Sequence, residues 1–324
     1  MATRRMVRGV LGRSSRWAWQ RQSSTVAVVG LGNMGSALAQ NLADAGCRIF
    51  VHDRDPAVTQ SVASAVAGTA CSSVAEAVSE SDVVMSIVPN DEALTEVVEG
   101  DSGMLEAARN RSAPLLHVSC STVSPFTSRK LSEHQDITHV SAPVFARPDG
   151  LAARQAFFPV SGADADTRQA VETLLLNTGT RVFDFGDDAG AANVMKLCGN
   201  FLIAASIESI AESLALAEKN GLDRTQVMDL LTSTIFDCLI FKGYGERVAT
   251  RDHRPGGFSL VHGHKDVSLV LDTARKSQVP MPVGSVLQDR WLASLARGRG
   301  HLDWSAVGLS VSEDSGVPTE VPEK

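Results

Sequence analysis

The stretch Thr25-Val-Ala-Val-Val-Gly30-Leu-Gly32-Asn33-Met34-Gly35 decides how the first half of the chain folds. Its first five residues form a short apolar run rich in β-branched side chains, which is typical of a buried parallel strand. A Gly-x-Gly-x-x-Gly pattern follows at once. Residues 36–45 then form an amphipathic segment that ends at Gly46, and residues 48–53 form a second apolar run ending in an acid. This order of strand, glycine loop, helix, strand and acid predicts a dinucleotide-binding βαβ unit.

The glycines and the helix start have distinct expected roles in that unit. Gly30 would make the tight turn, Gly32 would let the backbone approach a pyrophosphate, and Gly35 would allow the helix to pack closely on the strand. The phosphates are expected on the free N–H groups at the helix start, near Asn33 and Met34.

The end of the second strand bears on the choice of cofactor. Asp53 lies where the carboxylate that binds a ribose 2′-hydroxyl belongs, and it would repel a 2′-phosphate. Arg54 follows at once and could grip that phosphate or stack on an adenine. We favour NAD, with NADP as the alternative.

Two later strands are expected to end beside the cofactor, because ligands of open α/β sheets bind at the carboxyl ends of the strands. Residues 82–89 form one, and its end at Val88 and Pro89 should face the nicotinamide ribose. Residues 115–119 form the other and lead to Ser121 and Thr122, whose hydroxyls could bind cofactor or substrate. Ser124-Pro125 next to them can serve simply as the start of a helix.

Further strands at 137–141, 157–161 and 181–185 are expected to complete one sheet of about seven or eight strands, with a helix at 164–176 crossing between the last two. A long, mostly apolar helix is then expected at 191–220. Lys196 and Asn200 are four residues apart and therefore lie on one face of it. On its own, Lys196 could be an amine that reaches the surface from an amphipathic helix.

Few strand signals follow the long helix, so an all-α domain is expected in the last third of the chain. Its expected helices lie at 224–231, 267–274, 283–296 and 303–309. The predicted organisation is a possible leader at 1–24, a dinucleotide-binding domain at 25–188, an all-helical substrate and oligomerisation domain at 189–309, and a disordered tail at 310–324. The apolar surface of the helical part favours a homodimer or homotetramer.

The charge distribution bears on partners and location. Residues 1–24 carry six arginines and no acid, so the rest of the chain is more acidic than the net charge of −7 suggests. That acidity argues against nucleic acid as a partner. The Arg- and Ser-rich start is typical of a mitochondrial transit peptide and predicts the mitochondrial matrix, with the cytoplasm as the alternative if the segment is only a basic tail. Polar residues interrupt the longest apolar stretch, so no membrane association is expected. His262 and His264 lack a carboxylate at ligand spacing, and no metal is expected.

Together these motifs resemble the β-hydroxyacid dehydrogenases, the group that contains 3-hydroxyisobutyrate dehydrogenase. The resemblance covers about residues 25–308 and rests on the glycine loop, on Ser121-Thr122, on Gly190…Lys196…Asn200, and on Lys265-Asp266. It implies a Rossmann-type doubly wound domain joined to an all-α domain by the long helix.

The resemblance also implies residue roles. Lys196 would be the catalytic acid/base, and Asn200 would help to hold the substrate. Ser121 and Thr122 would contact substrate and cofactor, and Lys265 would lie near the nicotinamide. The implied reaction interconverts a small hydroxyacid and its aldehyde.

One motif departs from the family pattern. Where the family has Asp-Ala-Pro-Val-Ser-Gly-Gly, this chain has Ser141-Ala-Pro-Val-Phe145-Ala146-Arg147. Phe145 and Ala146 cannot form the same open loop, since glycine is what permits a close backbone approach. Arg147 could grip a substrate carboxylate instead, or it could point to solvent.

Two other functions fit the same pattern. A bulky residue at 145 suggests an imine or bulkier-carbonyl reductase of similar fold, although such enzymes usually carry Asp or Tyr in place of Lys196. A non-catalytic dinucleotide-binding relative is the other alternative, but such relatives tend to lose the lysine.

Overall fold

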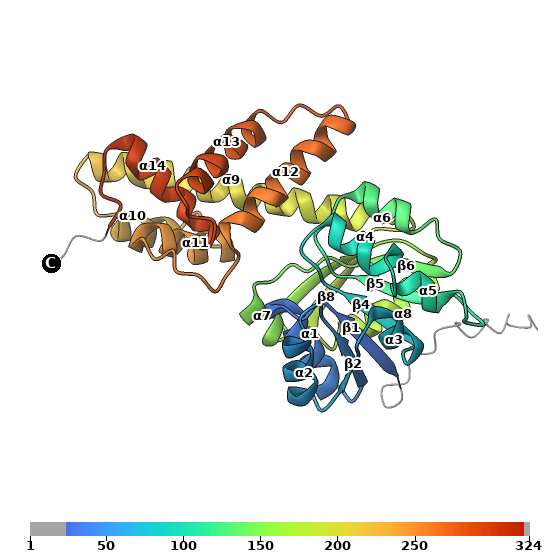
Figure 1. Ribbon diagram of the computed structural model, residues 1–324. Coiled ribbons are helices and arrows are strands. Elements are labelled where there is room, and N and C mark those ends of the chain that lie inside the picture. Colours follow the sequence, from blue (N-terminus) through green and yellow to red (C-terminus); the bar gives the residue numbers. More distant parts are fainter. Residues whose placement is uncertain (1–23, 321–324) are drawn as a thin grey trace, which may run out of the picture.

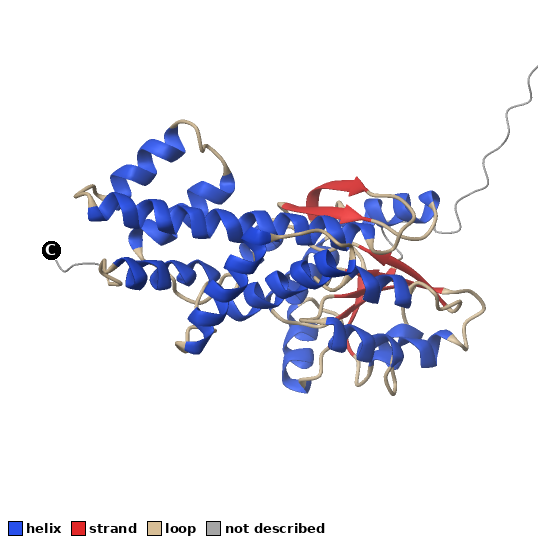
Figure 2. Ribbon diagram, turned by 90° about the horizontal axis from the view of Figure 1, so that it is seen from above, coloured by secondary structure: helices blue, strands red, loops and turns tan. Residues whose placement is uncertain are grey.

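The computed structural model describes residues 24–320, which fold into a sheet domain followed by a helical domain (Figure 1). The predicted leader at 1–24 lies outside the described residues except for Ser24. In Figure 2 all strands lie toward one end of the molecule, and the other end is helical. The expected fold class, a doubly wound α/β domain joined to an all-α domain by a long helix, is confirmed.

Six parallel strands form the main sheet in the order β3-β2-β1-β4-β5-β6. They are β1 (Thr25–Val29), β2 (Arg48–His52), β3 (Thr69–Ala70), β4 (Val83–Ser86), β5 (Leu115–Ser119) and β6 (Ile137–Ser141). The chain runs outward from β1 to β3, returns to the middle, and runs outward again from β4 to β6. The carboxyl ends of β1 and β4 therefore form the switch point at which such sheets bind ligands.

Helices cover both faces of this sheet, as its apolar strands require. α1 (Asn33–Asp44), α2 (Pro56–Ala65) and α7 (Pro148–Ala152) contribute to the core on one face. α3 (Val74–Ser79), α4 (Asp91–Glu99), α5 (Met104–Ala108) and α6 (Pro125–Leu131) contribute to the core on the other.

The prediction of one sheet of seven or eight strands is wrong. β7 (Ala156–Val160) and β8 (Gly179–Asp184) form a separate two-stranded parallel sheet, with α8 (Ala165–Leu175) between them in sequence. Only an isolated antiparallel bridge, Ser141 to Ser161, connects β7 to β6. Pro159 lies within β7 and has no N–H group, so β7 cannot serve as a fully paired central strand between two neighbours.

A chain of polar side chains crosses the main sheet beneath α3 to α6. Ser86 Oγ lies 2.8 Å from His117 Nε2, His117 Nδ1 lies 3.1 Å from His139 Nδ1, and His139 Nε2 lies 3.3 Å from Ser141 Oγ. Both imidazoles are buried. Burial lowers the pKa of His139 to about 4 and holds the pKa of His117 well below its usual value, so both rings are neutral in the folded protein.

The long helix α9 (Ala191–Lys219) belongs to both domains. At its start, the Ala192 N–H donates to Ser161 Oγ and the Asn193 amide donates to Ser128 in α6. Further along, Ile207, Ala211 and Leu214 lie in the core of the helical domain. Among residues 24–320, α9 alone is long and apolar enough to span a membrane, but 44% of its most apolar window is buried within the protein, and soluble core helices share that composition.

The helical domain packs five helices and a short 3-10 turn around the second part of α9. They are α10 (Arg224–Ser233), α11 (Leu239–Thr250), α12 (Leu260–Lys276), α13 (Pro282–Ala296), η1 (Trp304–Ala306) and α14 (Val307–Ser315). The sequence missed α11, and it placed the start of α12 seven residues too late.

The expected disordered tail from residue 310 is wrong for its first residues, because α14 continues to Ser315. Val311 and Ser312 are buried in it. Residues 321–324 lie outside the described residues.

Candidate active site

The glycine loop after β1 has the geometry that its sequence predicts. Gly30 has a φ of +88°, and a Cβ there would lie 2.4 Å from the Ile87 carbonyl oxygen. A Cβ on Gly35 would lie 1.8 Å from the Gly30 carbonyl oxygen. A Cβ on Gly32 would meet nothing within 4 Å, so the space in front of this residue is open to a ligand.

The start of α1 suits an anion. The helix begins at Asn33, and its N-cap Gly32 has no side chain to bond the free N–H groups of the first turn. The loop and the helix start together therefore fit the pyrophosphate of a dinucleotide, with Asn33 and Met34 supplying N–H groups.

Asp53 ties the second strand to this loop. Its Oδ2 accepts a hydrogen bond of 2.7 Å from the Leu31 N–H, and its Oδ1 accepts one of 3.0 Å from the Asp55 N–H. Arg54 beside it is exposed and has no hydrogen bond or ion pair within residues 24–320. Asp53 could therefore still repel a 2′-phosphate, and Arg54 could still bind one. The preference for NAD over NADP stays a prediction.

The ends of β4 and β5 are joined by a hydrogen bond. The Val88 N–H donates to Ser121 Oγ over 2.8 Å, and Ser121 is only 1% exposed. Pro89 next to Val88 is exposed. Ser121 therefore has a backbone partner at the switch point, and its contact with substrate stays a prediction.

Lys196 lies near the start of α9 and is only 8% exposed. Its Nζ lies over the ring of Phe145, 4.2 Å from the ring centroid, and it has no hydrogen bond within the described part of the chain. Burial lowers the pKa of Lys196 to about 8, with a smaller lowering effect from Lys265 and an opposing effect from Asp266. Such an amine can gain or lose a proton near neutral pH.

A buried carboxylate connects Asn200 to Lys265. Asp266 Oδ2 accepts a hydrogen bond from the Asn200 side-chain amide, and Asp266 Oδ1 lies 3.0 Å from Lys265 Nζ. Lys265 Nζ also donates to the Thr122 carbonyl over 2.6 Å. The structure therefore brings together the predicted residues of α9, of α12 and of the segment after β5.

Sequence reasoning missed Asp266 as a site residue. It is 1% exposed and shares the buried face of α12 with Gly263, Val267 and Val270. An acid at a core position of an amphipathic helix was the available signal. It was lost because α12 was expected to begin only at Val267, which left Asp266 as a polar residue before the helix.

The Arg147 side chain forms an ion pair within the protein, which neither alternative drawn from the sequence, a substrate carboxylate or solvent, had included. Its Nη1 lies 3.2 Å from Oδ2 of the buried Asp303, and its guanidinium lies over the Tyr244 ring at 5.5 Å. The charge is thus neutralised by the helical domain, and the side chain neither points freely to solvent nor remains unpaired for a substrate carboxylate. The predicted substrate contact of Arg147 gains no support.

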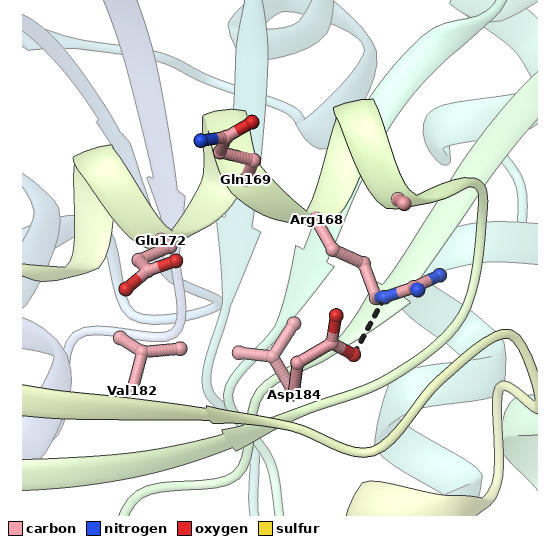
Figure 3. A pocket seen from close by; sticks show the side chains of 7 residues that line it. Arg168, Gln169, Glu172, Val182 and Asp184 are labelled. Atoms are coloured by element: carbon pink, nitrogen blue, oxygen red, sulfur yellow. Dashed lines mark hydrogen bonds and ion pairs between the residues drawn. The ribbon is translucent and has the colours of Figure 1, made fainter.

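A surface pocket of about 250 Å³ lies apart from these residues, between α8 and β8 (Figure 3). Arg168 points into it, but this cation is already paired with Asp184 at 2.7 Å and with Asp187 at 2.5 Å. Within residues 24–320, no three His, Cys, Asp or Glu side chains are grouped so as to hold a metal ion.

Comparisons with known proteins identify the family to which this fold and site belong. Residues 25–186 match the NAD-binding domain of 6-phosphogluconate dehydrogenase. Residues 190–309 match the NAD-binding domain of NADP-dependent 3-hydroxyisobutyrate dehydrogenase. The chain belongs to the β-hydroxyacid dehydrogenase family.

Individual relatives agree with this assignment. The chain is 31% identical to a 3-hydroxyisobutyrate dehydrogenase of Pseudomonas aeruginosa, over 87% of this chain and 96% of the relative. It is 30% identical to an L-threonate dehydrogenase of Cupriavidus necator, over 88% and 95%. The solved structure of Mycobacterium tuberculosis 3-hydroxyisobutyrate dehydrogenase with L-serine matches with a TM-score of 0.78 and 29% identity, covering 90% of this chain and 99% of that one. This β-hydroxyacid dehydrogenase is an NAD(P)-dependent oxidoreductase.

Proposed function

We propose that this enzyme interconverts a small 3-hydroxyacid and its semialdehyde, with Lys196 as the acid/base. The observation that carries the proposal is the buried amine of Lys196, whose pKa is lowered to about 8, beside the Asn200–Asp266–Lys265 group. A general acid/base works best when its pKa lies near the working pH.

The residues divide the chemistry as follows. In the oxidative direction, neutral Lys196 accepts the proton of the substrate hydroxyl, and in the reductive direction its ammonium form donates a proton to the carbonyl oxygen. Asp266 holds one N–H of the Asn200 amide, so the other amide N–H can donate to the substrate oxygen. NAD(P), when bound, accepts or supplies the hydride.

The test of the acid/base role is Lys196→Ala. We expect turnover to fall by roughly two orders of magnitude or more, because the proton has no acceptor, while cofactor affinity stays the same. Lys219→Ala, at the other end of the same helix, is the matched control. Turnover of Lys196→Ala within a few-fold of the Lys219→Ala value would exclude the role.

The substrate class needs a panel of small 3-hydroxyacids and semialdehydes, assayed with NAD and with NADP at the nicotinamide absorbance. A cyclic imine belongs in the panel, because Phe145 occupies a position where the family has a small residue. Turnover of the imine alone would replace our proposal with that of an imine reductase. Cofactor binding without any turnover would favour a non-catalytic relative.

We further infer import into the mitochondrial matrix from the six arginines and absence of acids in residues 1–24. A fluorescent protein carrying residues 1–30 should colocalise with a matrix marker. The same fusion with the arginines changed to glutamine is the control. A cytosolic signal from the unchanged fusion would contradict import.

A further inference from the structure

Phe145 is the residue at which this chain departs from its family, and the structure fixes it firmly. Its N–H donates to the Phe157 carbonyl over 2.9 Å, and its carbonyl accepts from the Phe157 N–H over 3.2 Å. The backbone at 145 is thus held against the start of β7. The side chain can only turn toward the neighbouring elements from this fixed point, and it turns toward α9.

The ring then meets α9 at two residues that are three apart and so lie on the same side of the helix. Its face lies 4.2 Å from Lys196 Nζ. Its edge lies against Gly199, where a Cβ would stand 2.5 Å from both Cε1 and Cζ of the ring. Any larger residue at 199 would clash with the Phe145 ring, so the ring can lie beside Lys196 only because residue 199 is glycine.

Lys196 Nζ has no hydrogen bond in the described residues, although the charge of Asp266 favours its ammonium form. The Asp266 carboxylate itself accepts a hydrogen bond from Asn200 and forms an ion pair with Lys265. An aromatic face attracts an ammonium group through its ring quadrupole and needs no hydrogen-bond acceptor. The ring can therefore hold the amine while N–H groups on its other side stay available to the substrate oxygen.

We propose that Phe145 is a positioning residue, which holds the Lys196 amine toward the substrate through its ring face and which depends on Gly199 for its place. The proposal deepens the proposed function and rests on Lys196 being the acid/base. It gives a role to Phe145 at the position where the family pattern has a small residue.

The first test is Phe145→Leu, which keeps an apolar side chain beside the amine but removes the aromatic face. We expect kcat to fall about tenfold with little change in KM. The midpoint of the pH profile should move down by about half a unit to one unit, because the attraction that favours the ammonium form is lost. Phe145→Tyr keeps the ring and should restore both values. Phe157→Leu, the bridge partner on β7, is the matched control.

The second test uses the contact with α9. Gly199→Ala should displace the ring and lower kcat as Phe145→Leu does. In the Phe145→Leu background, the same change should alter kcat less than twofold, because no ring is left to displace. Gly243→Ala in α11 is the control for helix propensity, since a Cβ there meets nothing within 4 Å.

A readout independent of turnover separates this proposal from the acid/base role. The pH dependence of Lys196 acetylation by acetic anhydride, followed by mass spectrometry, reports the pKa of the amine itself. We expect the acetylation midpoint to fall in Phe145→Leu. An unchanged or raised midpoint would overturn the positioning role, even if Lys196→Ala is inactive. Full activity of Lys196→Ala would overturn the acid/base role, and the acetylation midpoint would still decide whether Phe145 holds the amine.

Discussion

At the scale of single residues, the site depends on how three charged groups share a small volume. Lys196 is dehydrated, Lys265 repels it, and Asp266 attracts it, and the dehydration dominates because the pKa falls to about 8. Asp266 in turn tolerates its burial because Lys265 forms an ion pair with it and Asn200 donates a hydrogen bond to it. The four side chains therefore act as one electrostatic unit.

The pH dependence of the reaction should report the protonation of Lys196. In the oxidative direction the amine must be neutral, so kcat/KM should rise with pH and level off above about 8. In the reductive direction the ammonium form is needed, so kcat/KM should fall above about 8. Initial rates between pH 6 and 10 in both directions measure this. Profiles that change in the same direction would contradict the assignment.

Changing Asp266 should affect both geometry and charge. Asp266→Asn removes a charge that raises the pKa of Lys196, so the midpoint of the pH profile should move to lower pH. It also leaves Lys265 and Asn200 without their shared anchor, and kcat should fall by roughly 10- to 100-fold. Asp272→Asn, an exposed acid on the same helix, is the control. Equal behaviour of the two variants would remove Asp266 from the site.

The sequence predicted the roles of single residues well where those roles depend on the conformation of the neighbouring backbone. Gly30 is required by the positive φ of its turn, and Gly35 by its close approach to the Gly30 carbonyl, and the structure has both features. The role of Gly32 beside a pyrophosphate stays a prediction. The ion pair of Arg147 and the place of Asp266 in the site were not predicted, because their partners, Asp303 and Asn200, are distant in the chain. No spacing rule connects such pairs.

At the scale of elements, packing decided the boundaries that local propensity missed. α12 begins at Leu260 and includes Gly263, although glycine is a poor helix former. A Cβ on Gly263 would lie 2.7 Å from Trp291 Nε1 and 2.9 Å from the Trp304 ring, so packing requires glycine at this position. The glycine lets the helix lie close to both indoles. In α14, Ser310 reads as a tail residue, but it is buried and its hydroxyl lies 2.8 Å from the Ser294 hydroxyl.

The buried histidines of the sheet predict sensitivity to acid. Their folded-state pKa values are lowered, so unfolded chains bind more protons than folded ones once the pH falls below about 6.5, and for His139 this difference extends to about pH 4. Stability is therefore fully present above about pH 6.5 and is lost as the pH falls toward 4. His139 alone contributes on the order of 3 kcal/mol to this loss.

Thermal melts at pH 8, 6.5 and 5 test this expectation. The Tm should be nearly constant between the first two and fall clearly at pH 5. His139→Asn should reduce the acid-induced fall, whereas His301→Asn, at an exposed position, should not. The same Tm at pH 8 and pH 5 would show that the buried imidazoles do not control acid stability.

At the scale of the whole molecule, the helical domain leaves large apolar side chains uncovered. Leu202 and Leu216 on α9 are 62% and 69% exposed, and Ile235 and Leu239 near α11 are 79% and 80% exposed. Large apolar side chains that stay this exposed can take part in a contact with another protein. A second copy of the chain is the partner that the sequence already favoured.

Sedimentation velocity at micromolar concentration should therefore show a dimer or tetramer. Leu216→Asp should shift the distribution toward monomer, because a charge would be buried at the contact. Leu176→Asp at the end of α8, on the sheet domain, should not. A monomeric unmodified protein would contradict this expectation.

The shared helix α9 also limits how the gene can change. Each residue added to an α-helix turns everything beyond it by about 100° and advances it by about 1.5 Å. One codon inserted after Asn200 would swing the whole helical domain around the helix axis and carry Asp266 and Lys265 away from Asn200 and Thr122. The residue count of α9 therefore fixes how the two halves of the site meet.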